Sequence, residues 1–165
     1  MAYKGAWDRS LVVVPEGDDL QRVLGTLTLR IRRTPEEVWV HGRQFPDAMD
    51  ADDGNWLRVT AHCGGTGASV FVAGSIIQVP DILHWGRQCA RLLDGEAKAA
   101  ALDPLEPALS AIIDSADRHG HFRLLVEITP DHLRQKHVFE FEIDQSHLPG
   151  LIRQCDSIAC EYPPR

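Results

Sequence analysis

Long hydrophobic runs are missing from this sequence. No stretch of about 18 consecutive apolar residues, the length needed to cross a bilayer, occurs among the 165 residues. Near the N-terminus the longest apolar stretch covers only residues 11–14, which is too short for a signal peptide. We therefore expect a protein that contacts no membrane and resides in the cytoplasm.

Cysteine is scarce, and its spacing excludes two kinds of site. The four cysteines are Cys63, Cys89, Cys155 and Cys160, and no two of them form a CxxC pair. A structural zinc site needs such close pairs, and a disulfide framework is typical of secreted chains. We expect these thiols to be buried small apolar residues, with no metal bound.

Basic residues are outnumbered. Lysine and arginine total 17 against 24 aspartate and glutamate residues, so the net charge is −7. The longest basic cluster is Arg30, Arg32 and Arg33, whereas a protein that binds duplex nucleic acid normally carries a basic stripe. Nucleic acid is therefore not an expected partner. A basic protein or a small cation is compatible with the charge.

Signatures of catalysis are also lacking. No G-x-S-x-G motif surrounds Ser69, Ser75 or Ser110, and the glycine-rich residues 64–67 lack the Lys-Ser/Thr of a phosphate-binding loop. We therefore expect no catalytic residues, no cofactor and no enzymatic activity. A hydrolase would need a pocket with convergent histidines and carboxylates, which a sequence cannot display.

What the sequence does contain is a series of short alternating segments and two amphipathic ones. Apolar and polar residues alternate with the period of a half-buried strand, and residues 64–67 resemble a hairpin turn. The predicted strands cover residues 23–32, 37–41, 55–61, 69–73, 76–79, 109–113, 122–128 and 138–143.

Two segments have helical periodicity. Residues 81–94 and 147–160 each place their apolar side chains on one face. Asp81 and Ser146 are the expected N-caps, and Gly95 is the expected end of the first helix. Buried positions are expected at Ile82, Trp85, Cys89, Leu92 and Leu93, and at Leu148, Leu151, Ile152, Cys155, Ile158 and Ala159, while His84, Arg87, Gln88 and Arg91 face away.

A short internal sequence repeat, called here the internal echo, includes part of each helix. Arg87-Gln88-Cys89 recurs as Arg153-Gln154-Cys155, and at the same offset Gly54 and Trp56 correspond to Gly120 and Phe122. This suggests two strand–strand–helix units that share one sheet and could be related by pseudo-symmetry. The predicted fold is α+β, with a mainly antiparallel sheet of about six to eight strands. We expect one domain over residues 21–165, preceded by an N-terminal arm or extra strand at 1–20.

The densest polar cluster is acidic. Asp47, Asp50, Asp52 and Asp53 lie in one loop before Gly54. They could cap turns, bind calcium or contact a basic partner, although the spacing does not fit an EF-hand.

Other titratable groups give weaker signals. His119 and His121 are two apart, with His132 and His137 after them, and we interpret all four as surface or hairpin histidines. Glu140 and Glu142 alternate with phenylalanines, which predicts the solvent-facing side of a strand.

From residue 38 onward the chain resembles the WapI-like family of bacterial immunity proteins. The matching features include residues 45–48 followed by acidic positions, Asp53-Gly54-Asn55-Trp56-Leu57 entering a strand, and Leu92-Leu93-Asp94-Gly95 ending a helix. Others are residues 105–109 before a strand, Phe139-Glu140-Phe141, and a last helix ending at Tyr162-Pro163.

The resemblance implies a non-enzymatic cytoplasmic protein that binds and occludes a cognate toxin domain. Contacts would come first from Asp47, Asp50, Asp52 and Asp53, and then from Glu140 and Glu142. Phe45, Trp56 and Trp85 are expected to be core anchors. The alternative is a stand-alone ligand- or calcium-binding module that uses the same acidic loop.

Overall fold

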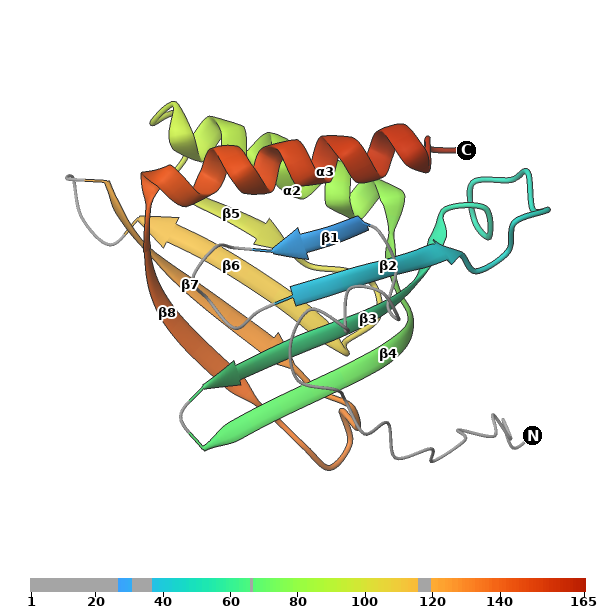
Figure 1. The fold of residues 1–165 in the computed structure, drawn as a ribbon, viewed down its shortest axis with the longest axis horizontal. Helices are drawn as coiled ribbons and strands as arrows, with labels where there is room; N and C mark the ends of the chain where they lie inside the picture. The colour runs from blue at the N-terminus through green and yellow to red at the C-terminus, as the bar shows by residue number, and fades with distance from the viewer. Residues whose placement is uncertain (1–26, 31–36, 66, 116–119) are drawn as a thin grey trace.

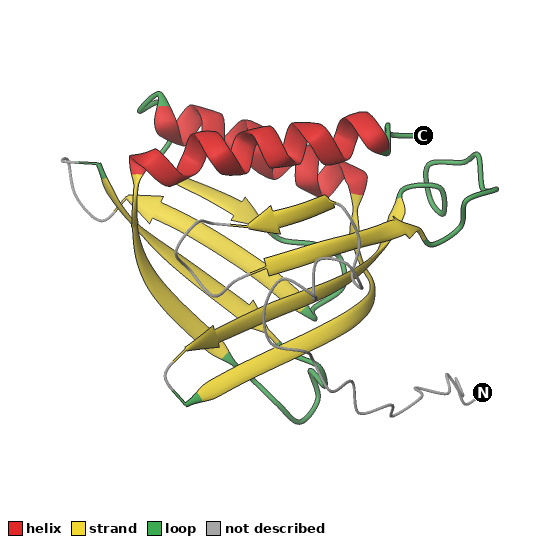
Figure 2. Ribbon diagram, in the orientation of Figure 1, coloured by secondary structure: helices red, strands yellow, loops and turns green. Residues whose placement is uncertain are grey.

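The structure, a computed structural model, describes residues 27–30, 37–65, 67–115 and 120–165. In this part of the chain, two four-stranded antiparallel sheets face one another, and two helices lie side by side across one end of both (Figure 1). Figure 2 shows that the helices occupy the same end of the molecule. The α+β prediction is confirmed, but the prediction of one shared sheet is wrong.

The chain forms each sheet in sequence order and then a helix. The first sheet contains β1 (Leu27–Arg30), β2 (Glu37–Arg43), β3 (Trp56–Gly65) and β4 (Ala68–Gln78), followed by α2 (Val79–Leu93). The second sheet contains β5 (Ala99–Leu102), β6 (Leu109–Ser115), β7 (His121–Ile128) and β8 (Val138–Asp144). A 3₁₀ turn, η1 (Gln145–His147), then leads into α3 (Leu148–Glu161).

The two halves are built alike, as the internal echo suggested. Strands β1 and β5 have four residues each, and β2 and β6 have seven each. The pairing registers also correspond. Glu37, the first residue of β2, faces His62 of β3, and Leu109, the first residue of β6, faces Ile128 at the equivalent position of β7. The halves differ in two connections. Residues 44–55 join β2 to β3 but only residues 116–120 join β6 to β7, whereas residues 66–67 join β3 to β4 and residues 129–137 join β7 to β8. The acidic loop is thus an enlargement of the first half.

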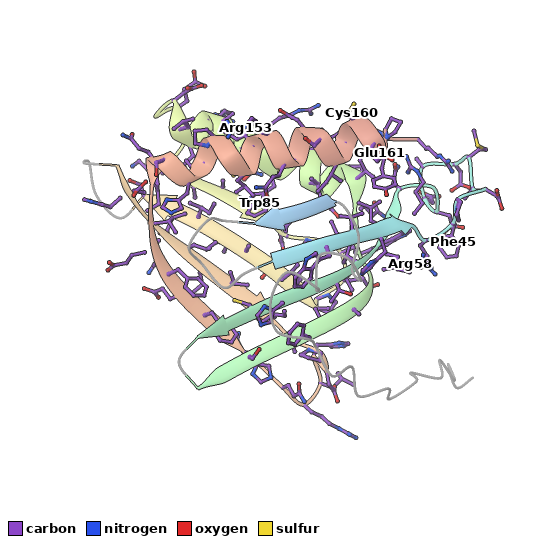
Figure 3. All side chains as sticks on the ribbon, viewed as in Figure 1. Phe45, Arg58, Trp85, Arg153, Cys160 and Glu161 are labelled. Carbon is purple, nitrogen blue, oxygen red and sulfur yellow. The ribbon has the colours of Figure 1, made fainter. Side chains whose placement is uncertain are left out.

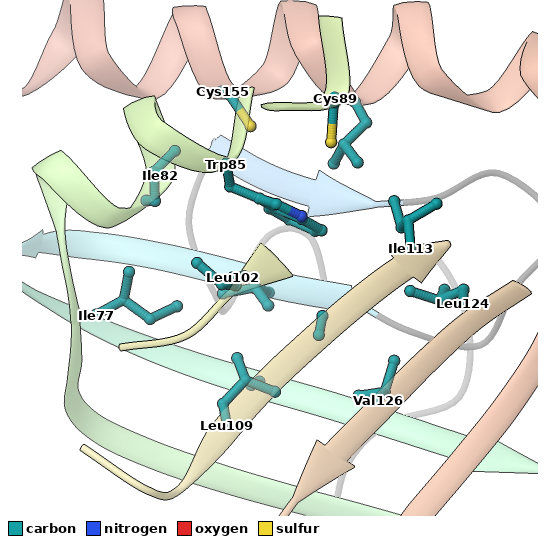
Figure 4. Close-up of a cluster of buried hydrophobic side chains, with 14 of the residues drawn as sticks. Ile77, Ile82, Trp85, Cys89, Leu102, Leu109, Ile113, Leu124, Val126 and Cys155 are labelled. Carbon is teal, nitrogen blue, oxygen red and sulfur yellow. The ribbon is translucent and has the colours of Figure 1, made fainter. Parts of the chain in front are cut away.

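Alternation of apolar residues creates the core. On β3 the inward side chains Leu57, Val59, Ala61 and Cys63 are fully buried. Those of β7 form the opposing layer, and the helices close one end (Figure 4). The same cluster includes residues of both sheets and both helices, so the halves share one hydrophobic core.

Each helix packs against the first strand of the other half. Helix α2 contacts β5, α3 contacts β1, and the helices contact each other. The helices lie close together at Gly86, where an added methyl group would lie 2.9 Å from Cys155 Cβ. Glycine is needed there because any larger residue would push the helices apart.

Helix boundaries differ from the prediction at both N-termini. Helix α2 begins at Val79-Pro80, and Asp81 occupies its first turn, where its carboxylate accepts the Gln78 N–H at 2.8 Å. Ser146 is not the N-cap of α3, because that position belongs to His147. Asp144 caps the preceding turn η1, where its carboxylate accepts the Ser146 N–H at 2.8 Å. The end of α2 at Gly95 is confirmed, with φ +75°.

Some side-chain predictions were also wrong. Gln88 does not face away: its Oε1 accepts the Ala101 N–H of β5 at 2.7 Å.

Strand β5 itself was not predicted, and β4 is one continuous strand. Cys63, Cys89 and Cys155 are buried as expected, but Cys160 is exposed. The N-terminal arm or extra strand at 1–20 and His119 lie outside the described residues.

Candidate functional site: the acidic loop

The acidic loop, defined as residues 44–55, extends from the body of the molecule beside the end of α3 (Figure 1). Asp47, Asp50, Asp52 and Asp53 are all exposed on it. The structure therefore brings the four predicted aspartates together on one projecting segment.

Hydrogen bonds within the loop fix its turn. Asp50 Oδ1 accepts the Asp53 N–H at 2.8 Å, and the Asp50 carbonyl accepts the Gly54 N–H at 3.0 Å. The Asp53 N–H bond lowers the pKa of the exposed Asp50 carboxyl, because it favours the ionised form. Asp50 thus has a local structural role in addition to its charge.

The C-terminal segment, residues 162–165, fastens the base of the loop. The side chain of Asn55 is 3% exposed and pairs with the backbone of Arg165 in both directions. Asn55 Oδ1 accepts the Arg165 N–H at 2.9 Å, and Asn55 Nδ2 donates to the Arg165 carbonyl at 3.1 Å. One donated and one accepted hydrogen bond, as between paired residues of two antiparallel strands, thus join segments that are far apart in sequence.

Two guanidinium groups complete this attachment. Arg165 donates to the carbonyls of Pro46, at 2.7 Å, and of Ala48. Arg43 donates to the carbonyls of Gly54 and Pro163. The carbonyls of Pro46, Ala48 and Gly54 are therefore paired with arginines, which helps to keep the loop backbone in one shape.

Gly54 is required by this close packing. A side chain there would meet the Asp50 carbonyl at 2.5 Å and Arg165 Cδ at 2.8 Å. Gly54 and Asn55, in that order, are therefore structural requirements of the fastened loop.

Apolar side chains accompany the carboxylates. Phe45 is 45% exposed and Met49 78% exposed, so the prediction that Phe45 anchors the core is wrong. Figure 3 shows Phe45 at the loop and Trp85 inside the body of the molecule. Trp85 is buried as predicted, and Trp56 is half-buried. The position of Phe45 directly before Pro46, outside any alternating segment, was the available signal.

The glutamates predicted as additional contacts lie elsewhere. Glu140 and Glu142 are exposed on β8, on the opposite side of the molecule from the loop (Figure 1). Glu142 faces Arg123 across the strands, and Arg123 pairs with Asp114 at 2.6 Å. This surface has mixed charge, and the structure does not join it to the acidic loop.

A hollow of about 690 Å³ lies near the C-terminal segment, which contributes Pro164. Asp81 and His84 of α2 and Asp103 after β5 line it. Burial raises the pKa of Asp81, and the charge of Asp103 acts in the same direction. The hollow adds further carboxylates to the side of the molecule where the C-terminal segment lies.

Metal binding finds no support in the described ranges. Within them, no three His, Cys, Asp or Glu side chains converge as ligands for an ion. His121 and His132 are exposed and His137 is half-buried, as expected of surface histidines.

No helix in the described part of the chain is long and apolar enough to span a bilayer.

The fold and loop define an α+β protein of two similar halves that displays a fastened acidic segment from the first half. Comparison with known families shows that residues 31–163 match the immunity protein WapI-like family. The chain therefore belongs to the WapI-like family of immunity proteins. No curated protein and no solved structure matches it.

Proposed function

We propose that this chain is a non-enzymatic immunity protein that binds a cognate bacterial toxin domain in the cytoplasm and occludes its active site. Membership of the immunity family supports this role. The observation that carries the proposal is the acidic loop, which presents four exposed aspartates on a backbone held by Asn55, Arg43 and Arg165.

The fastened loop is suited to tight binding because its shape is set before the partner arrives. A preorganised segment loses less conformational entropy on association than a disordered one. Its carboxylates, on a protein of net charge −7, would accelerate encounter with a basic surface by electrostatic steering. Phe45 and Met49 add apolar area that a partner could bury after that encounter.

The test is binding to any toxin-like domain encoded beside the gene, by calorimetry and stopped flow at two salt concentrations. The triple variant Asp47→Asn, Asp52→Asn, Asp53→Asn removes three charges and keeps Asp50, which holds the turn. We expect association to slow by about tenfold or more and to depend less on salt. The melting temperature should stay nearly unchanged, since these side chains are exposed.

A matched control is Glu140→Gln with Glu142→Gln on the mixed-charge face of β8. This variant tests the glutamates as secondary contacts, and we expect a smaller effect on association because the pair lies away from the loop. Unchanged association of the aspartate variant would remove the loop from the interface. Absence of any complex with the unaltered protein would overturn the proposed function for that toxin.

A further inference from the structure

Among the residues that the structure describes, strand β4 has one edge without a pairing partner. It is the last strand in the order β1-β2-β3-β4, and its backbone pairs only with β3. No other described segment forms a ladder with it, and at 11 residues it is the longest strand described. The free edge of an antiparallel strand presents alternate N–H and C=O groups without partners, and these can pair with another strand.

This edge lacks the features that usually prevent such pairing. The sequence of β4, residues 68–78, contains no charged residue and no proline. Native proteins protect exposed edges with charges, prolines or very short strands. By those criteria β4 is open to the addition of a strand.

The second half of the molecule provides an internal comparison. Strand β8 is the matching edge of the second sheet. Its residue Glu140 faces Leu125 of β7 at the position where Gly74 of β4 faces Val59 of β3. Yet β8 carries Glu140, Glu142 and Asp144. The remaining edge strands, β1 and β5, have four residues each and pack against α3 and α2. Only β4, among the described edges, is both long and uncharged.

The pairing with β3 identifies the outward backbone groups. Two residues connect Gly65 to Ala68, so these two form the closing, hydrogen-bonded pair of the hairpin. Alternation from that pair turns the backbone groups of Ser69, Phe71 and Ala73 away from β3. Side chains of all three are exposed, and Phe71 stacks on His62 with ring centroids 4.2 Å apart.

We propose that residues 69–73 of β4 receive an extended strand of the partner toxin domain, which adds a fifth strand to the first sheet. This inference rests on the proposed function and identifies a second contact surface for it. Backbone pairing would give affinity, and an uncharged partner strand with apolar side chains would fit Phe71 and Ala73. A second copy of this chain is a poorer occupant, because each copy carries −7 and the two would repel.

Ala73→Pro tests the edge in the full-length chain. Proline removes the outward N–H and is tolerated on free edges, so the melting temperature should fall by no more than about 4 °C. We expect the Kd for the toxin-like domain that the unaltered chain binds to rise by about tenfold or more, since a ladder bond is lost and the ring obstructs pairing. The matched Ala73→Ser variant keeps the N–H and should bind like the unaltered protein.

Hydrogen exchange on the unaltered protein supplies a readout that does not depend on the variant folding. Amides of Ser69, Phe71 and Ala73 should exchange rapidly in the free protein and become protected in the complex. Protection already present in the free monomer would overturn the proposal, because the edge would be covered. Sedimentation that shows a dimer dissolved by Ala73→Pro would equally overturn it, in favour of a second copy.

The outcome also separates this inference from the proposed function. If the toxin domain binds, depends on the aspartates and leaves β4 amides unprotected, the immunity role stands and the edge proposal fails. If the unaltered chain forms no complex, the proposed function itself fails.

Discussion

Asn55 is the residue on which the shape of the acidic loop depends. Its amide makes three hydrogen bonds: it donates to the carbonyls of Ala51, at 3.0 Å, and Arg165, and it accepts the Arg165 N–H. A polar side chain can be this well buried because every group on it has a partner.

We expect Asn55→Ala to lower the free energy of unfolding by about 1–3 kcal/mol, because it removes three partly buried hydrogen bonds to the backbone of Ala51 and Arg165. Urea denaturation measures this change, and faster proteolysis within residues 44–55 should accompany it. Asp52→Ala is the control, since this exposed side chain of the same loop should have an effect within about 0.5 kcal/mol. Equal stabilities for the two variants would show that the C-terminal segment does not hold the loop.

From the sequence, the acidic cluster and its exposure could be predicted at the residue scale, but its attachment could not. Four aspartates beside a glycine indicate a turn-rich polar loop. Asn55 and Arg165, however, are separated by 110 positions, and no local pattern reports such a contact. Phe45 was misplaced for a different reason, since its position before Pro46 and outside any alternating segment already indicated exposure.

At the scale of elements, the packing of α2 on α3 is set by one small residue. Gly86 lies against Cys155. Burial raises the pKa of the Cys155 thiol, and it raises the pKa of the Cys89 thiol to about 12. Both thiols therefore stay neutral and act as apolar packing groups near neutral pH.

Gly86→Ala should destabilise the protein by about 1–3 kcal/mol, even though alanine favours a helix, because the added methyl overpacks the helix interface. Gly150→Ala on α3 is a matched control: nothing lies within 4 Å of its added methyl. That variant should be neutral or more stable by up to about 1 kcal/mol. Thermal and urea unfolding measure both, and a stabilised Gly86→Ala protein would contradict the close helix contact.

Local patterns predicted most elements, and the failures have physical causes. Strands β3, β6, β7 and β8 alternate clearly, so their existence and buried faces followed from the sequence. Strand β5, Ala99–Leu102, consists of small residues with little β propensity, and its pairing with β6 forms it. The division into two sheets depends on long-range pairing, which periodicity does not encode.

At the scale of the whole molecule, the crossed helix packing makes the halves interdependent. Helix α2 needs β5 and α3 needs β1, so each half alone would expose an apolar helix face and an apolar sheet face. The single domain expected over residues 21–165 follows from this interdependence as a prediction.

Fragments 1–96 and 97–165 test it directly. We expect neither fragment alone to unfold cooperatively, whereas an equimolar mixture should regain near-ultraviolet circular dichroism and one thermal transition. The physical reason is that the shared core is completed only when residues of both halves are present. A cooperative transition in either isolated fragment would instead indicate two domains.

The attachment of the acidic loop to residues 162–165 also has a consequence for biosynthesis. Ribosomes make the loop early, but Arg165 and Pro163, which hold it, emerge more than a hundred residues later. Contacts of such high sequence separation form slowly and late in folding. The nascent chain therefore carries its aspartates long before it can present them in their final arrangement.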